Sequence, residues 1–320
     1  MKAAVLHALG QTPRFEDFRE PTAGEGEALV HVHAAALKPV DKQLASGSHF
    51  ASPREFPTVS GIDGVGHLDD GTRVFFGGPR APYGAMAQRT VAPRAFFFPV
   101  PEGVDDATAA ALPNPGISAW LTLTLSAKIA PGETVLILGA TGVTGKLAVQ
   151  IAKRLGTKRV IAAGRNERAL EALRGLGADA TIQLKQADAE LAAAFAREIG
   201  EARFDVVVDY LWGKPTETLL AAITKKEFAD AGKEIRLVQV GESAGPTISL
   251  PAAVLRSTAL SIRGTAGIPG REALADAFQQ VMMRAARGEL RIDTERVPLA
   301  EIDTAWQREP PAGRRLVVIP

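Results

Sequence analysis

The sequence predicts an α/β protein whose larger part is a doubly wound parallel sheet. From Thr134 onward, short apolar runs alternate with amphipathic stretches of helical period, which is typical of a parallel sheet covered by helices. A glycine-rich turn joins the first of these strands to the first of these helices. Residues 1–113 instead hold short strand-like runs separated by Gly and Pro, which indicate a separate β-rich, barrel-like domain.

Composition limits the function classes. The 320 residues suffice for two domains with full cores. The formal net charge of +1 gives no reason to expect nucleic acid or an anionic membrane as partner. The absence of cysteine excludes disulfides, thiolate catalysis and cysteine-ligated zinc, and is compatible with a reducing cytoplasm. No run reaches the roughly 18 apolar residues that a membrane span needs. We therefore expect a cytoplasmic protein.

In the first domain the sequence predicts strands at residues 3–6, 28–33, 72–76 and 86–91. His31 and His33 alternate on one strand and share a face. Without a third ligand nearby in the sequence, solvated histidines are favoured over a metal site. A helix is expected over 106–112, a break at Pro113–Gly116, and a second helix from Ser118 to Ala127.

In the second domain strands and helices are expected to alternate. The predicted strands are 134–138, 158–163, 180–184, 204–209, 235–240 and 259–263, and the predicted helices are 146–155, 166–175, 188–199 and 215–226. An amphipathic helix over 271–287 and a strand over 315–320 close the chain.

The glycine turn is the strongest functional signal. Ala140-x-Gly142-x-x-Gly145 fits the dinucleotide fingerprint with Ala in its first position. Strand, turn and helix in this order direct free backbone N–H groups and the positive end of the helix dipole at one point, which suits a pyrophosphate. We therefore expect the cofactor to contact the run from 140 to 145, above all Thr141, Gly142, Val143 and Thr144. A purely structural glycine turn is the alternative.

The end of the second strand indicates which nucleotide binds. NAD sites place an acid about 20 residues past the fingerprint, whereas NADP sites place Arg near the 2′-phosphate. Here Gly164 is followed by Arg165, and Arg168 lies one helical turn on. A planar guanidinium suits a phosphate, so these three residues predict NADPH. Solvated arginines at a helix start are the alternative, above all for Arg168.

Further motifs run from end to end of the chain. They are Pro39-Val-Asp41 with Gly47, Gly61-Ile-Asp-Gly-Val-Gly66, Gly71-Thr-Arg-Val74, Tyr83-Gly-Ala-Met-Ala-Gln88, Pro115-Gly-Ile-Ser-Ala-Trp120, Pro131-Gly-Glu-Thr-Val135, Leu176-Gly-Ala-Asp179, Phe204-Asp-Val-Val-Val-Asp209 and Gly313 to Pro320. With these motifs the chain resembles the medium-chain dehydrogenase/reductase superfamily, and within it the zinc-free, ζ-crystallin-like quinone oxidoreductases.

The resemblance implies a GroES-like β-barrel catalytic domain at 1–113 and 267–320, and a Rossmann NADP-binding domain at 114–266, with the cofactor in the cleft. It implies a homodimer with the run 258–264 at the interface. Zinc-dependent relatives have Cys at the place of Lys38, His at Ile62, and Cys or an acid near Pro115, so no metal is expected. Many quinone oxidoreductases have Asn at the place of Lys38 and Tyr at that of Gln43, which weakens any carry-over of catalytic residues.

Other cofactor contacts are expected at the ends of strands. Ser118 matches the family position that contacts the nicotinamide carboxamide, with helix capping as the alternative. Tyr210 and the pair Val240-Gly241 follow consecutive strands at their carboxyl ends, where ligands bind in open α/β sheets. Core packing is the alternative for the neighbouring aromatic Trp212. For Arg314 and Arg315, exposed strand-end positions are favoured over contacts with the cofactor phosphates.

The catalytic residues expected are Lys38 and Asp41. Hydride transfer leaves negative charge on the acceptor, which positioned donors must stabilise when no metal is present. Lys38 is expected to supply an ammonium or a proton. In the alternative, its ammonium pairs with Asp41 or Asp63 and only shapes the cleft. The loops 42–57 and 243–270 are expected to build the pocket.

The function expected is NADPH-dependent reduction of a quinone or α,β-unsaturated carbonyl compound, without a metal. One alternative is a ketone reductase or alcohol dehydrogenase, against which the loss of the metal ligands argues. The other is an NADPH-binding protein without significant turnover, as among the crystallins.

Overall fold

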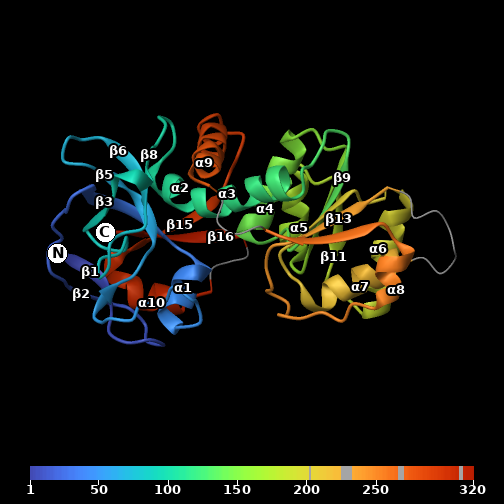
Figure 1. Cartoon of the computed structure of the whole chain (residues 1–320), viewed down its shortest axis with the longest axis horizontal. Helices are drawn as coiled ribbons and strands as arrows, with labels where there is room; N and C mark the ends of the chain where they lie inside the picture. Colours follow the sequence, from blue (N-terminus) through green and yellow to red (C-terminus); the bar gives the residue numbers. More distant parts are fainter. Residues whose placement is uncertain (202, 225–232, 266–269, 310–312) are drawn as a thin grey trace. The chain divides into compact units, whose positions relative to one another are not determined.

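The computed structural model describes residues 1–201, 203–224, 233–265, 270–309 and 313–320 (Figure 1). The chain separates into two compact units. Unit 1 consists of Met1–Asn114 and Phe278–Pro320, and unit 2 of Pro115–Ala277. The domain boundary expected between 266 and 267 lies outside the described residues.

Unit 2 is built on a six-stranded sheet in which every neighbouring pair is parallel. The order is β11-β10-β9-β12-β13-β14. The strands are β9 (Thr134–Leu138), β10 (Arg159–Gly164), β11 (Ala180–Gln183), β12 (Val206–Asp209), β13 (Ile235–Gln239) and β14 (Leu260–Gly264). Numbered from β9, this is the order 3-2-1-4-5-6 of dinucleotide-binding sheets. The doubly wound parallel sheet is thus confirmed.

The helices of unit 2 follow the expected alternation (Figure 1). They are α4 (Val143–Arg154), α5 (Glu167–Arg174), α6 (Asp188–Glu201), α7 (Gly213–Ile223) and α8 (Ala252–Ser257). Residues 225 and 226, which the prediction placed in α7, lie outside the described residues. Every residue of β9 is buried, because a central parallel strand is covered on both faces.

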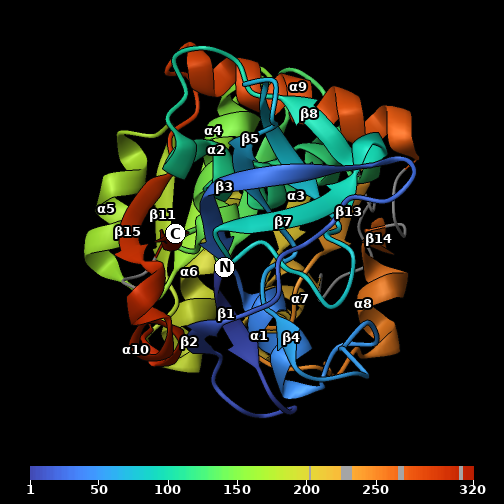
Figure 2. The same ribbon diagram turned by 90° about the vertical axis from the view of Figure 1, so that its left-hand side faces the viewer.

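Unit 1 contains two sheets (Figure 2). The larger has the order β15-β16-β3-β5-β6-β8, with β7 paired to β3; the smaller has the order β2-β1-β4. The strands are β1 (Lys2–Leu6), β2 (Arg14–Asp17), β3 (Glu27–Leu37), β4 (Thr58–Val59), β5 (Asp63–His67), β6 (Arg73–Gly77), β7 (Arg89–Pro93), β8 (Phe97–Pro99), β15 (Asp293–Pro298) and β16 (Arg314–Ile319). The β3 strand is central because it pairs with β5, β7 and β16.

The sequence pattern did not predict β5, which has the sequence DGVGH. A Cβ atom at Gly66 would lie 2.1 Å from the carbonyl oxygen of His31 on β3, and one at Gly64 would lie 2.8 Å from that of Ala34. Glycine is needed here so that the two backbones can approach, and the strand loses the side chains by which a strand is recognised.

The helices near the boundary of the two units correct one prediction. The break expected at Pro113–Gly116 is wrong, because α2 (Asp106–Ala111) is followed almost directly by α3 (Pro113–Leu121) and a π-helical turn, Thr122–Ser126. Proline is tolerated in a first helical turn, where its missing N–H would have no partner in any case. Ser118 consequently lies inside α3 rather than at its start.

The remaining helices are α1 (Pro39–Ser46), α9 (Arg271–Ala286) and α10 (Ile302–Gln307), with 3₁₀ turns at Arg94–Phe96 and Leu299–Glu301. In unit 1, Phe278 of α9 packs against Phe75 and Phe98, with ring centroids 5.3 and 4.7 Å apart. None of the helices within the described ranges is long and apolar enough to cross a membrane.

Candidate active site

The glycine-rich turn after β9 brings the start of α4 against the strand. A Cβ atom at Gly145 would lie 2.3 Å from the carbonyl oxygen of Gly139, so only glycine fits there. Gly142 is the N-cap residue of α4, and it offers no side-chain cap. The first N–H groups of α4, which include those of Val143 and Thr144, therefore face no capping side chain. This uncapped helix start fits a phosphate group.

The end of β10 lies beside this turn. A Cβ atom at Gly164 would lie 2.5 Å from Cγ2 of Thr141, so the Thr141 side chain rests on the glycine backbone. Arg165 and Arg168 follow, both exposed. Among the described residues neither guanidinium has a hydrogen-bond or ion-pair partner. Two unpaired cations close to the glycine turn fit an additional phosphate on the ribose.

The carboxyl ends of β12 and β13 also meet. The N–H groups of Val240 and Gly241 donate to the carbonyl oxygen of Asp209, at 2.8 and 3.2 Å. A Cβ atom at Gly241 would lie 2.9 Å from the carbonyl oxygen of Tyr210, so the structure brings these two predicted residues together. The Tyr210 hydroxyl is buried without a hydrogen-bond partner in the described part of the chain, and burial raises its pKa.

Asp209 organises the turn that carries Tyr210. Its Oδ1 accepts hydrogen bonds from the N–H groups of Leu211 and Trp212, at 2.8 and 2.9 Å, and its Oδ2 accepts one from the Thr216 hydroxyl at 2.6 Å. Burial raises the pKa of Asp209, against the opposing effect of these hydrogen bonds. The carboxyl group thus holds the turn at the end of β12 in place.

Ser118 lies in the middle of α3, half-buried. Its position inside the helix removes the alternative that it caps the start of a helix. Its contact with a cofactor stays a prediction.

In unit 1, Lys38 and Asp41 lie in a buried cluster of charges at the start of α1. Lys38 is the N-cap residue, and its backbone N–H donates to Oδ2 of Asp41 at 2.8 Å. Its ammonium donates to Oδ1 of Asp63 at 2.8 Å and to the carbonyl oxygen of Ala36 at 3.0 Å, and lies 3.5 Å from Oδ2 of Asp41. The side chains of Lys38 and Asp41 are both 0% exposed. The structure thus contains the ion pairs that one alternative predicted, and the catalytic role stays a prediction.

Arg315 of β16 is the second cation of this cluster, which corrects the expectation of an exposed strand end. The residue is 8% exposed, and its guanidinium donates to the carbonyl oxygen of Leu37 at 3.2 Å. The negative charges of Asp41 and Asp63 act to raise the pKa of the Arg315 guanidinium. Asp63 was expected only as an alternative partner of Lys38, and Arg315 was not expected in this cluster, because their proximity depends on the pairing of β3 with strands distant in the sequence.

Burial and charge act in opposite directions on the cluster. Burial disfavours the Lys38 ammonium, but Asp41 and Asp63 outweigh this effect and raise the pKa of Lys38. Burial raises the pKa of Asp41, although Lys38 acts to lower it. Burial lowers the pKa of Arg315, against the two carboxylates. Lys38 therefore stays charged, while Asp41 holds a proton more readily than an ordinary aspartate.

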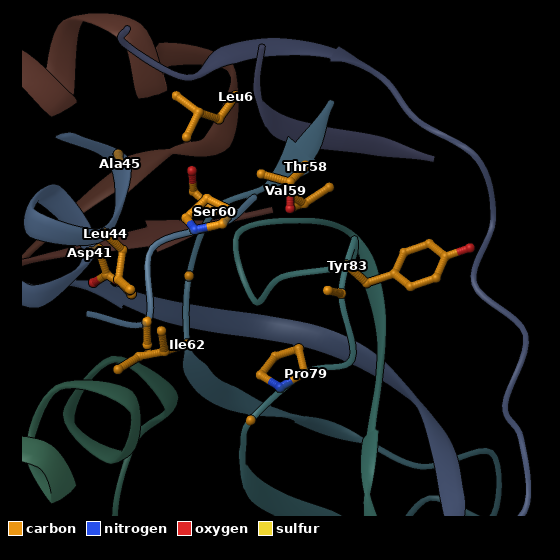
Figure 3. Close-up of a pocket in the computed structure, with 15 residues that line it drawn as sticks. Leu6, Asp41, Leu44, Ala45, Thr58, Val59, Ser60, Ile62, Pro79 and Tyr83 are labelled. Carbon is orange, nitrogen blue, oxygen red and sulfur yellow. The ribbon is translucent and has the colours of Figure 1, made fainter. Parts of the chain in front are cut away.

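A pocket of about 220 Å³ adjoins this cluster within unit 1 (Figure 3). Its lining is mostly apolar and comes from α1, from the loop that follows it, and from the segments around residues 60 and 80. Part of the loop expected at 42–57 thus borders a pocket. For the second expected loop, 243–270, residues 266–269 lie outside the described part.

His31 and His33 of β3 lie next to a third histidine, His67 of β5. His31 faces His67 across β3 and β5, and His33 Nε2 lies 3.2 Å from His67 Nδ1. His31 pairs with Asp69 at 2.9 Å and His33 with Asp106 at 3.2 Å. Across the described ranges, no group of three or more His, Cys, Asp or Glu side chains is arranged to hold a metal ion.

Comparison with known proteins identifies the family. The family model described as zinc-binding dehydrogenase matches residues 143–284. A quinone-oxidoreductase homologue from chloroplasts of Spinacia oleracea is 31% identical over 271 residues, which are 77% of this chain and 78% of that protein. A probable NADPH-dependent quinone reductase of Emericella nidulans is 29% identical over 230 residues, which are 68% of this chain but 63% of that protein. The match thus spans less than two thirds of the latter relative.

Among solved structures, the quinone oxidoreductase from Thermus thermophilus, which is also known in complex with NADPH, is 29% identical. Its TM-score is 0.80, and the comparison covers 100% of both chains. The parallel sheet, the glycine turn and these relatives agree. The chain therefore belongs to the zinc-free quinone oxidoreductases of the medium-chain dehydrogenase/reductase superfamily.

Proposed function

We propose that this protein is an NADPH-dependent oxidoreductase that reduces a quinone or an α,β-unsaturated carbonyl compound without a metal. The observation that carries the proposal is the uncapped start of α4 next to two exposed arginines, Arg165 and Arg168, which have no partner among the residues that the structure describes. The names of the relatives support the same chemistry.

The cofactor site of this proposal combines the segments at the carboxyl ends of the strands in unit 2. The run from Thr141 to Thr144 binds the pyrophosphate through backbone N–H groups. Gly164, Arg165 and Arg168 bind the adenosine phosphate. The remaining contacts come from Ser118, Tyr210, Val240 and Gly241. When bound, the reduced nicotinamide supplies a hydride.

The chemical step of this proposal takes place beside Lys38 and Asp41 in unit 1. Reduction of the acceptor needs a proton or a hydrogen-bond donor as well as a hydride. Both residues are buried ionisable groups, and Asp41 borders the pocket.

The proposed assembly is a homodimer that forms through β14, in the cytoplasm. β14 ends the sheet of unit 2 and pairs on one side with β13, and an open edge strand offers backbone groups to a second copy.

The cysteine-free composition is compatible with a reducing compartment. Neither nucleic acid nor membrane is a proposed partner, in keeping with a net charge of +1.

A direct assay tests the activity. The absorbance of NADPH is followed with an ortho-quinone, an enal and a simple ketone as acceptors. We expect consumption with the first two and not with the ketone. Tight binding of NADPH without consumption of any acceptor would instead indicate a binding protein, and consumption with the ketone alone would indicate a carbonyl reductase.

A further inference from the structure

Two imidazole rings lie against each other on the larger sheet of unit 1. His33 comes from β3 and His67 from its antiparallel neighbour β5. Nε2 of His33 lies 3.2 Å from Nδ1 of His67, whereas the ring centroids are 4.3 Å apart and the ring planes are tilted by 50°. The rings are therefore closest at these two nitrogens and diverge away from them. The side chain of His33 is 43% exposed, so water and ions can reach the pair.

The register of β3 explains why these two rings meet. His31 stands directly opposite His67, and a regular pairing would place His33 diagonally from His67. The register instead shifts between Val32 and Ala34. His33 is the residue left without an opposite partner, as in a β-bulge, and a bulge redirects a side chain.

A carboxylate holds the other nitrogen of His33. Nδ1 of His33 lies 3.2 Å from Oδ2 of Asp106, the first residue of α2. Oδ1 of the same carboxyl group accepts a hydrogen bond from Nε of Arg73 at 2.8 Å, so Asp106 is itself fixed. When His33 donates Nδ1–H to this carboxylate, its Nε2 presents a lone pair on the side of His67. A carboxylate behind the imidazole is the usual arrangement around a metal-bound histidine.

The spacing of the two nitrogens fits one metal ion. Zn²⁺ binds imidazole nitrogen at about 2.0–2.1 Å, and a point at that distance from two nitrogens 3.2 Å apart sees them at roughly 100–105°, close to a tetrahedral angle. Imidazole suits Zn²⁺, whereas Mg²⁺ and Ca²⁺ prefer oxygen ligands. Across the described ranges no third His, Cys, Asp or Glu completes the group. Water therefore takes the other positions around the ion.

The protons of the pair do not oppose a cation. Burial, followed by the charge of His33, lowers the pKa of His67, while Asp106 acts to raise it. The ring of His67 is therefore uncharged at neutral pH. When its proton lies on Nε2, its Nδ1 also presents a lone pair. Binding of a metal ion then needs a change of tautomer and no net loss of a proton.

We propose that His33 and His67 form a Zn²⁺ site in unit 1, with Asp106 orienting His33. None of these residues belongs to the proposed cofactor site or lines the pocket beside α1. The inference thus goes beyond the proposed function and does not depend on it. The bound ion joins β3 to β5 and, through Asp106, to the start of α2, so it stabilises this part of unit 1.

Calorimetry with Zn²⁺ on the untagged protein, freed of chelators, tests the site. We expect the wild type to bind one ion per chain. His33→Ala and His67→Ala should each weaken binding by more than about 100-fold, and Asp106→Asn by about 10-fold, since the loss of an outer partner costs roughly 10–100-fold in metal affinity. His31→Ala is the matched control. It removes an exposed imidazole from the same face of β3 and should leave the affinity nearly unchanged.

Three results would overturn the assignment. A wild type that takes up no Zn²⁺ would show that two imidazoles and water do not suffice. Binding that survives both His33→Ala and His67→Ala would place the ion elsewhere. An equal loss in His31→Ala would show that a third histidine is a ligand, against a site of two.

Nuclear magnetic resonance on the wild type keeps the test independent of how the variants fold. With isotope-labelled histidine observed through its ring nitrogens, Zn²⁺ should shift the signals of two of the five histidines. The bound nitrogen should be Nε2 in one ring and Nδ1 in the other. Shifts at Nε2 alone, or shifts spread over all the rings, would reject the proposed chelate.

Thermal unfolding measures what the ion does for the fold. A ligand that binds only the folded chain raises its melting temperature. Zn²⁺ should therefore raise the Tm of the wild type and of His31→Ala, but not that of His33→Ala or His67→Ala. An equal rise in all four proteins would indicate zinc bound elsewhere, and no rise in the wild type would show that the ion does not stabilise unit 1.

Discussion

At the residue scale, the proposed preference for NADPH depends on Arg165 and Arg168. Both follow β10 at the edge where the glycine turn lies, and both are exposed. Sequence spacing alone predicted Arg165, because the fingerprint and the next strand lie in one continuous stretch of chain. Local motifs of this kind can be read from a sequence since no distant contact is needed to place them.

Removing these arginines should weaken NADPH binding selectively. Arg165→Gln and Arg168→Gln should each raise the KM for NADPH about 10-fold or more, since a hydrogen bond to a charged group contributes about 1.5–3 kcal/mol. The KM for NADH should stay nearly the same. Steady-state kinetics with both nucleotides measures this. Arg174→Gln on the same helix, which removes an ion pair with Glu171, should change neither value.

Lys38 shows what the sequence leaves open. Its type and position predicted two roles, and one of them named Asp41 and Asp63 as partners. Only the folded chain shows that these pairs are buried and that Arg315, on the last strand, lies near them. Long-range pairing of β3 with β5 and β16 brings these charges together. No local pattern in the sequence marks such a pairing.

The charge cluster should behave as a unit in unfolding experiments. Lys38→Met leaves two carboxylates with one guanidinium and should cost about 3–5 kcal/mol of stability. Lys38→Met combined with Asp63→Asn restores charge balance and should recover much of the loss. Urea unfolding of the single and double variants measures the coupling, and simple additivity of the two effects would show that the cluster is not coupled.

The same cluster gives stability a dependence on alkaline pH. The pKa of Lys38 is raised in the folded state. Its contribution to stability is therefore fully present below the unfolded pKa and is lost as the pH rises through the higher folded value. The difference in stability between the wild type and Lys38→Met should shrink over that alkaline range.

At the level of elements, the packing of α4 on β9 depends on Gly145. The alternating strands and helices of unit 2 were predicted nearly in place, because buried parallel strands and amphipathic helices have strong periodic patterns. In unit 1, β5 was missed because close backbone contact replaces its side chains with glycine. The break before α3 was wrong because proline suits a first helical turn.

Gly145→Ala should separate α4 from the turn. Its Cβ atom would meet the carbonyl oxygen of Gly139 at 2.3 Å, so the helix start must shift. We expect a loss of roughly 1–3 kcal/mol in stability and a marked loss of NADPH affinity, measured by thermal unfolding and calorimetry. Gly200→Ala in α6 is the control, since nothing lies within 4 Å of its added methyl group. It should stabilise the protein slightly.

At the level of the whole molecule, the proposed dimer depends on the open edge of the sheet in unit 2. The sheet has two edge strands, β11 and β14. Ser261→Lys on β14 should give a monomer, because a charge on an edge strand opposes pairing with another edge. Thr181→Lys on β11 should leave the dimer intact. Light scattering coupled to size-exclusion chromatography measures both, and a wild type that elutes as a monomer would reject the proposed assembly.

Under the proposed function, the buried ammonium of Lys38 has a chemical consequence. Enals and quinones alkylate thiols and free amines by conjugate addition. The chain has no thiol, and none of the described residues that line the pocket carries an amine or an imidazole. The amine of Lys38 is held as an ion-paired cation with 0% of its side chain exposed. An enal or quinone that entered this pocket would thus meet no thiol, imidazole or amine among the described residues that line it.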